Sequence, residues 1–97
     1  MKAPFFNVIG ISYKNANTSV RGMFSLSLDQ SKLLIQESLN EGIDNLIVNS
    51  TCNRVEIYSS SSDVNLLIKL LCKYSRGTIR DFKKYGYTIE GAEAINH

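Results

Sequence analysis

The residues best suited to chemistry lie in one short polar stretch, Ser50-Thr51-Cys52-Asn53-Arg54, between two apolar runs. A thiol in a turn between two strands is accessible to a substrate, and a thiolate is a strong nucleophile. Arg54 lies two residues beyond Cys52, so in extended backbone its guanidinium can sit beside the thiol or beside a bound carboxylate. Thr51 and Asn53 add hydrogen-bonding groups. These residue types are compatible with a nucleophilic cysteine site, but spacing alone is a weak signal and equally allows an inert turn cysteine.

Composition limits the classes of protein that could carry this stretch. The chain has 97 residues, 43% hydrophobic and 21% charged, with 11 basic and 9 acidic side chains and a net charge of +2. This length predicts one domain with a modest core, and the net charge is too small to indicate nucleic-acid binding by itself. No apolar run approaches the roughly 20 residues of a membrane helix. We find no signal peptide, and a cytoplasmic protein with reduced thiols is expected.

The other candidate groups have simpler interpretations. Cys72 falls on the apolar stripe of a predicted helix, which favours packing. His97 is the single histidine, and a lone histidine at a helix start is usually a surface or partly buried residue. Two cysteines without a CxxC pair and one histidine exclude a zinc finger and a disulfide-rich scaffold, so no metal is expected.

Hydrophobic periodicity predicts the elements that position these residues. Strands are expected at residues 5–11, 46–49, 55–58 and 82–89, with a loop over 12–19. A first helix is expected over 28–41, where Ser27 and Gln30 form a capping box. A second helix follows an N-cap at Ser62 or Asp63 and ends at Gly77, and a third begins near Gly91. The order β-α-β-β-α-β predicts an α+β fold of the ferredoxin-like type, an antiparallel sheet with two helices on one face.

The stretch from Ser50 to Tyr58, STCNRVEIY, closely resembles the signature of glutamyl-tRNA reductase. The similarity continues at Gly10-Ile11-Ser12-Tyr13-Lys14-Asn15-Ala16-Asn17, Val20-Arg21, Phe24-Ser25, Tyr85-Gly86-Tyr87, Gly91, Ala94 and His97. Three positions depart from that family, with Tyr13, Asn15 and Asn17 in place of its usual His, Thr and Pro. The resemblance implies that residues 1–97 are a truncated N-terminal catalytic domain that binds glutamyl-tRNA. The resemblance further implies that the NADPH-binding and dimerisation domains lie outside this chain. The sequence has no GxGxxG loop with which residues 1–97 could bind the cofactor.

The resemblance also implies an activity. The family is an oxidoreductase that uses NADPH to reduce glutamyl-tRNA to glutamate-1-semialdehyde, the first step of tetrapyrrole synthesis from glutamate. By that resemblance Cys52 is the nucleophile that holds glutamate as a thioester, and Arg54 binds the substrate's side-chain carboxylate. Thr51 and Asn53 would hold the rest of the amino acid. His97 would polarise the carbonyl or protonate the leaving group.

The family further implies a cytoplasmic homodimer and a possible handover of product to glutamate-1-semialdehyde aminomutase. Lys83-Lys84-Tyr85, extended by Lys73, Arg76 and Arg80, could contact tRNA phosphates, but a solvated strand face is the simpler interpretation. The alternative function is a ferredoxin-like RNA-binding or interaction module without catalysis. Val55 to Tyr58 lacks the Lys/Arg-Gly-Phe core of an RNA-recognition domain, which counts against this alternative.

Overall fold

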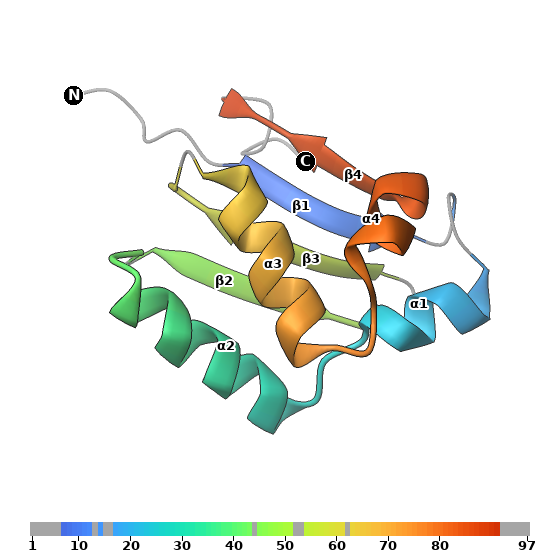
Figure 1. Ribbon diagram of the computed structural model, residues 1–97, viewed down its shortest axis with the longest axis horizontal. Coiled ribbons are helices and arrows are strands. Elements are labelled where there is room, and N and C mark those ends of the chain that lie inside the picture. The colour runs from blue at the N-terminus through green and yellow to red at the C-terminus, as the bar shows by residue number, and fades with distance from the viewer. Residues whose placement is uncertain are drawn as a thin grey trace.

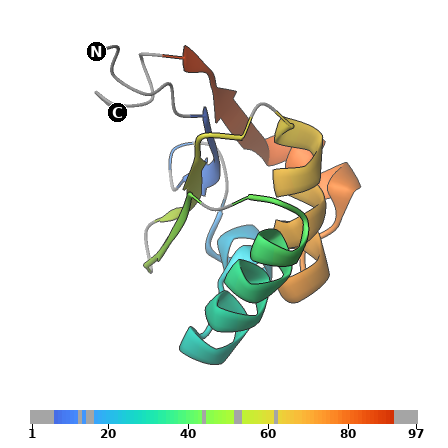
Figure 2. The ribbon, with the colours of Figure 1, turned by 90° about the vertical axis from the view of Figure 1, so that its left-hand side faces the viewer.

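The computed structural model describes residues 7–12, 14, 17–43, 45–51, 54–61 and 63–91, and contains eight helices and strands there (Figure 1). In chain order these are β1 (Asn7–Ser12), α1 (Thr18–Phe24), α2 (Leu28–Asn40), β2 (Leu46–Ser50), β3 (Arg54–Ser59), α3 (Val64–Tyr74), α4 (Ile79–Tyr85) and β4 (Gly86–Ile89). The strands form one antiparallel sheet in the order β2-β3-β1-β4. Figure 2 shows α2, α3 and α4 gathered on one face of this sheet.

Most of the predicted elements are confirmed. The helix α2 begins with the expected capping box, in which the Ser27 hydroxyl and the Gln30 side chain each accept the other residue's backbone N–H. The helix α3 begins after Asp63, whose carboxylate accepts the Leu66 N–H at 3.1 Å. It ends at Tyr74 rather than near Gly77, because the chain turns out of the helix at Ser75. The helix expected after Gly91 lies outside the described residues.

Two predicted segments are corrected by the structure, and with them the expectation of only two helices over the sheet. The sequence predicts a loop over 12–19, but α1 already begins at Thr18, where Asn17 caps the helix by accepting the Val20 N–H at 2.9 Å. The segment 82–89 was expected to be a strand throughout. Thr78 instead caps α4 by accepting the Asp81 N–H at 3.1 Å, and the strand begins only at Gly86.

The core lies between the sheet and the helices. The sheet contributes apolar side chains from alternate positions of β1 and β3, and every helix adds at least one buried apolar residue: Ile9, Ile11, Val55, Ile57, Val20, Phe24, Leu34, Leu67, Leu70, Leu71 and Phe82. The two short helices meet through their aromatic rings, because Phe24 of α1 and Phe82 of α4 pack edge to face with centroids 6.2 Å apart. The elements missed by periodicity are therefore part of the core.

Gly77 is required by this aromatic contact. A Cβ at Gly77 would lie 2.2 Å from the ring of Phe24, which is fully buried. We expect Gly77→Ala to lower the free energy of unfolding by about 1–3 kcal/mol, the usual cost of overpacking a core. The matched control is Gly22→Ala in α1, where nothing lies within 4 Å of the new methyl group. Because alanine has a higher helix propensity than glycine, the control substitution should raise the free energy of unfolding by up to about 1 kcal/mol. Urea unfolding compares the two variants, and equal midpoints would contradict the steric account.

Candidate functional site

The candidate nucleophile belongs to the connection between β2 and β3. The Thr51 N–H donates to the Arg54 carbonyl at 2.9 Å, and the Arg54 N–H reaches the Thr51 hydroxyl oxygen at 3.3 Å. The two strands therefore stay paired up to these residues, and only Cys52 and Asn53 separate them in sequence. Of the predicted site residues, Thr51 and Arg54 are described, whereas Cys52, Asn53 and His97 lie outside the described residues.

Arg54 begins β3 on the sheet face opposite the helices. Its neighbour Val55 packs into the core, so alternation along the strand places Arg54 and Glu56 together on the other face. Arg54 Nη1 lies 3.8 Å from Glu56 Oε1, and 35% of the Arg54 side chain remains exposed. The opposite charges of Arg54 and Glu56 attract each other at this separation. Because 3.8 Å is longer than a hydrogen bond, the N–H donors of the guanidinium remain available to a ligand.

Glu56 is a functional candidate that sequence reasoning missed. A glutamate in an alternating strand is expected to face solvent, yet this side chain is only 1% exposed. Its Oε1 accepts the Tyr58 hydroxyl at 2.9 Å, and its Oε2 accepts the Tyr87 hydroxyl. A buried carboxylate requires such partners, because an unpaired buried charge is costly. Burial, followed by the hydrogen bond to Glu56, raises the pKa of both tyrosines, so they remain protonated donors at neutral pH.

Gly10 makes the contact between Glu56 and Tyr87 possible. In the sheet, Gly10 of β1 is opposite Glu56 on one side and opposite Tyr87 of β4 on the other. A Cβ there would lie 2.7 Å from the Val55 carbonyl oxygen, 2.8 Å from Tyr87 Oη and 2.9 Å from Glu56 Cγ. The bare backbone of Gly10 therefore leaves the space in which two side chains meet across β1. An isolated glycine in a strand is the sequence signal for such a close approach.

The remaining cysteine has the environment of a packing residue. Cys72 of α3 is half-buried and packs against the hydrophobic core, as expected from its place on the apolar stripe. Burial raises the pKa of its thiol, which disfavours the nucleophilic thiolate. Cys72 therefore serves as an internal reference for Cys52.

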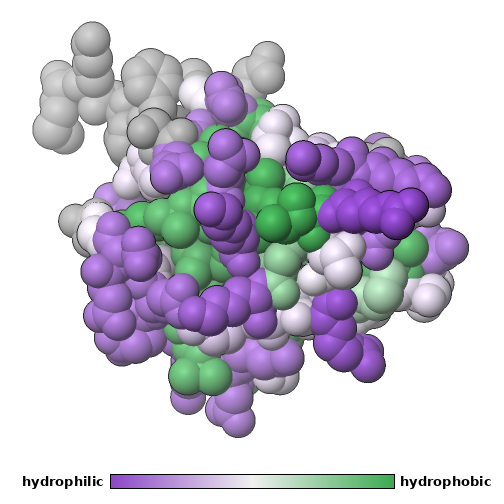
Figure 3. All heavy atoms as spheres, viewed as in Figure 1, coloured by the Kyte–Doolittle hydropathy of each residue, from purple (hydrophilic) through white to green (hydrophobic). Residues whose placement is uncertain are grey.

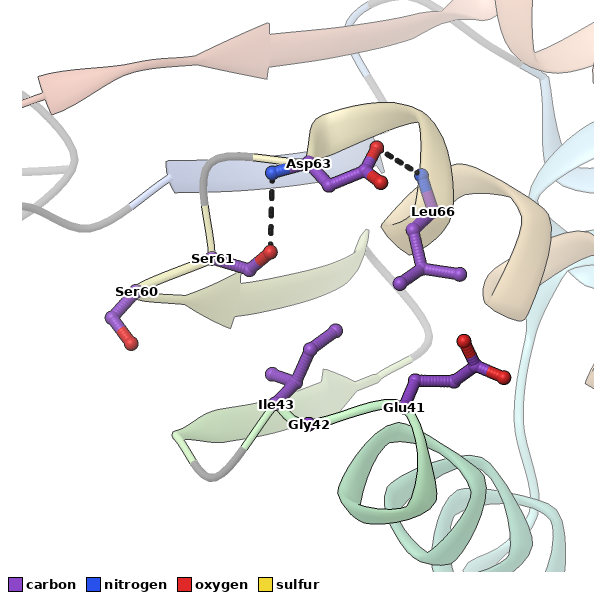
Figure 4. Close-up of a pocket in the computed structure, with 7 residues that line it drawn as sticks. All are labelled: Glu41, Gly42, Ile43, Ser60, Ser61, Asp63 and Leu66. Carbon is purple, nitrogen blue, oxygen red and sulfur yellow. Dashed lines mark hydrogen bonds between the residues drawn. The ribbon is translucent and has the colours of Figure 1, made fainter.

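A separate hollow lies at the far end of β3 from Arg54, between the end of α2 and the start of α3 (Figure 4). Its lining is Glu41, Gly42, Ile43, Ser60, Ser61, Asp63 and Leu66. Two of its polar side chains have structural tasks, because Asp63 caps α3 and the Ser61 hydroxyl accepts the Asp63 N–H at 3.1 Å. We assign this hollow to capping rather than to chemistry.

Within the described part of the chain, no three His, Cys, Asp or Glu side chains lie close enough together to hold a metal ion. Among the same residues, no helix is long and apolar enough to cross a membrane.

Fold and site together define a small α+β domain whose antiparallel sheet ends in a hairpin with Cys52 in its sequence, next to an arginine–glutamate pair. Residues 9–97 match the family model described as "Glutamyl-tRNAGlu reductase, N-terminal domain". The chain belongs to this family.

Individual relatives agree with this assignment. The chain is 47% identical over 92 residues to the glutamyl-tRNA reductase of Flavobacterium psychrophilum and 44% identical to that of Christiangramia forsetii. Each match covers 95% of this chain and 22% of the relative, so the chain spans about a fifth of the length of these proteins. Among solved structures, glutamyl-tRNA reductase from Methanopyrus kandleri matches with a TM-score of 0.67 at 20% identity. That match covers 95% of this chain and 20% of the other, and it supports the fold.

Proposed function

We propose that this chain is the thioester-forming domain of a glutamyl-tRNA reductase, which carries out the first step of tetrapyrrole synthesis from glutamate. The observation that carries the proposal is the hairpin closed by Thr51 and Arg54, with Cys52 in its sequence, in a chain that belongs to this family. A non-catalytic RNA-binding module is not favoured, because it would give Cys52 no task.

Cys52 is the proposed nucleophile. Its thiolate attacks the carbonyl carbon of the aminoacyl ester, the bond from that carbon to the tRNA ribose oxygen breaks, and the oxygen takes up a proton. Glutamate is then held on Cys52 as a thioester, whose carbonyl accepts hydride more readily than an ester does. We propose that His97 polarises the carbonyl or protonates the leaving oxygen. Thr51 and Asn53 are proposed to hold the amino acid.

The reductant is proposed to be NADPH held outside this chain. The sequence has no GxGxxG phosphate-binding loop, and we derive no step in which residues 1–97 bind the cofactor. By analogy with the family, we further propose a cytoplasmic homodimer that passes its product to glutamate-1-semialdehyde aminomutase. We also propose that the sheet order β2-β3-β1-β4 is a ferredoxin-like arrangement to which α1 and α4 have been added.

The release of tRNA from glutamyl-tRNA tests the nucleophile. The protein should accelerate this deacylation, and Cys52→Ser should return it to the spontaneous rate. Cys72→Ser is the matched control and should retain the activity, because Cys72 packs against the core. Equal deacylation by the wild-type and Cys52→Ser proteins would contradict the proposal.

Arg54 is proposed to select glutamyl-tRNA by binding the side-chain carboxylate of its glutamate. A charged hydrogen bond of this kind is worth about 1.5–3 kcal/mol, so Arg54→Ala should lower the preference for glutamyl over glutaminyl ester by about 10- to 100-fold. Arg54→Lys should lose part of that preference, because an ammonium cannot bind a carboxylate bidentately. Competition between glutamyl-tRNA and glutaminyl-tRNA measures it, and an unchanged ratio in Arg54→Ala would assign recognition to another residue.

A further inference from the structure

The charges of this chain are strongly segregated. Residues 64–85, which form α3, α4 and the loop between them, hold six of the 11 basic side chains and one of the nine acidic ones, a net charge of 6 − 1 = +5. The rest of the chain has five basic and eight acidic side chains, a net charge of −3. The net charge of +2 is therefore the sum of a basic region at residues 64–85 and an acidic remainder.

These six cations form a surface that we call the basic face: Lys69, Lys73, Arg76, Arg80, Lys83 and Lys84. All six are exposed. Spacings of three and four residues put neighbours on the same side of a helix, as for Lys69 and Lys73 on α3 and for Arg80, Lys83 and Lys84 on α4. Lys73 is paired with Glu37 at 2.6 Å. The other five form no ion pair with a described acidic side chain, so most of the positive charge is uncompensated.

A shallow cleft joins the two helices into one surface. Ile68 and Lys69 of α3 line it together with Ile79 and Lys83 of α4. Figure 3 shows hydrophobic surface in the middle of this side of the molecule, bordered by hydrophilic residues. Two lysines from different helices thus border the same cleft, so α3 and α4 both contribute positive charge to one continuous surface.

The loop end of the basic face lies near the cysteine hairpin. The Arg76 N–H donates to the Met23 carbonyl at 2.8 Å, which fixes the α3–α4 loop against the end of α1. Three residues later, the Leu26 N–H donates to the Ser50 hydroxyl at 3.1 Å, one residue before Thr51. The basic face therefore begins at the end of the sheet where the hairpin lies (Figure 1).

We propose that the basic face binds the phosphate backbone of the RNA whose aminoacyl end reaches the hairpin. This inference rests on the proposed function and adds the surface through which the polynucleotide is held. Phosphate contacts by Lys and Arg release condensed counterions, so the affinity should fall steeply with salt concentration. Since such contacts position the RNA without reading its bases, they complement the amino-acid recognition assigned to Arg54.

The test compares two double variants with the same change in net charge. Lys69→Glu with Lys83→Glu alters the basic face, whereas Lys14→Glu with Lys32→Glu alters exposed positions elsewhere. We expect the first pair to weaken binding of deacylated tRNA at least tenfold and to reduce the slope of log affinity against log salt by about 1.5–2. The control pair should change affinity severalfold less. Lys69→Gln with Lys83→Gln should fall between the wild type and the glutamate pair.

Equal weakening by the basic-face pair and the control pair would overturn the proposal, because it would reduce the effect to net charge. Undiminished binding in the basic-face pair would also overturn it. A small glutamyl ester without RNA separates this inference from the proposed function. Its reaction with Cys52 should be unchanged in the basic-face variants, and failure of that reaction in the wild-type protein would count against the thioester mechanism alone.

Discussion

Replacing Gly10 with alanine is expected to lower the free energy of unfolding by about 3 kcal/mol, at the upper end of the usual cost of overpacking. The new methyl group would lie within 3.0 Å of three atoms, including the Val55 carbonyl oxygen. That oxygen belongs to the backbone of β3, so it cannot move away without disturbing the pairing of β1 with β3. The same substitution should also slow the reaction with glutamyl-tRNA, because it separates Tyr87 from Glu56 next to Arg54.

Urea unfolding measures the first effect, with Gly22→Ala as the control for an open glycine site. Adding Tyr87→Phe to Gly10→Ala should recover only part of the loss, since it removes the clash with Tyr87 Oη and leaves the clash with the Val55 carbonyl. A Gly10→Ala protein as stable as the wild type would show that the sheet has room at this position.

Replacing Glu56 with glutamine is expected to cost about 2 kcal/mol of stability at neutral pH, which is typical for loss of charged hydrogen bonds. Both carboxylate oxygens accept tyrosine hydroxyls, whereas a glutamine amide offers one oxygen and one NH₂ group. Arg54 also loses its negative neighbour, so we expect slower reaction with glutamyl-tRNA. Glu41→Gln is the matched control, because Glu41 is exposed and forms no ion pair with a described basic side chain.

The pH dependence of stability is a specific test of the contacts among Glu56, Tyr58 and Tyr87. The pKa values of Tyr58 and Tyr87 are raised in the fold above the ordinary value of 10.0, first by burial and then by hydrogen bonding to Glu56. The folded protein therefore holds these protons more tightly than the unfolded chain. The stability that this difference in pKa contributes is fully present below the pKa of the tyrosines in the unfolded chain. It is lost as the pH rises through their pKa values in the folded protein. Stability should decline above about pH 10, less steeply in Tyr87→Phe and in Glu56→Gln. Urea unfolding across this range measures the slope, and identical slopes in all three proteins would contradict the assignment.

The sequence predicted the elements that have strong local signals. The capping box at Ser27 and the apolar stripes identified α2 and α3, and β-branched runs identified β1, β2 and β3. The helices α1 and α4 were missed because each has only seven residues, too few for a clear helical period. In α4, the aromatic residues Phe82 and Tyr85 favoured a strand, whereas the Thr78 cap and the packing of Phe82 against Phe24 stabilise a helix.

The sequence predicted the reactive residues of the candidate site but not the buried Glu56 that lies next to Arg54. The STCNR stretch indicated Cys52 and Arg54 by residue type and resemblance, and the structure places Thr51 and Arg54 at the closure of the hairpin. The burial of Glu56 depends on Tyr87, which is 31 residues away in sequence and reaches it across a third strand. Local alternation contains no information about that contact.

Attachment of glutamate to Cys52 is tested most directly by peptide mapping with mass spectrometry after brief reaction with glutamyl-tRNA. We expect a hydroxylamine-sensitive glutamyl adduct on the peptide that contains Cys52, no adduct on the peptide that contains Cys72, and none in Cys52→Ser. An adduct that survives Cys52→Ser would contradict it, as would the absence of any adduct from this chain and from a longer form that continues past His97.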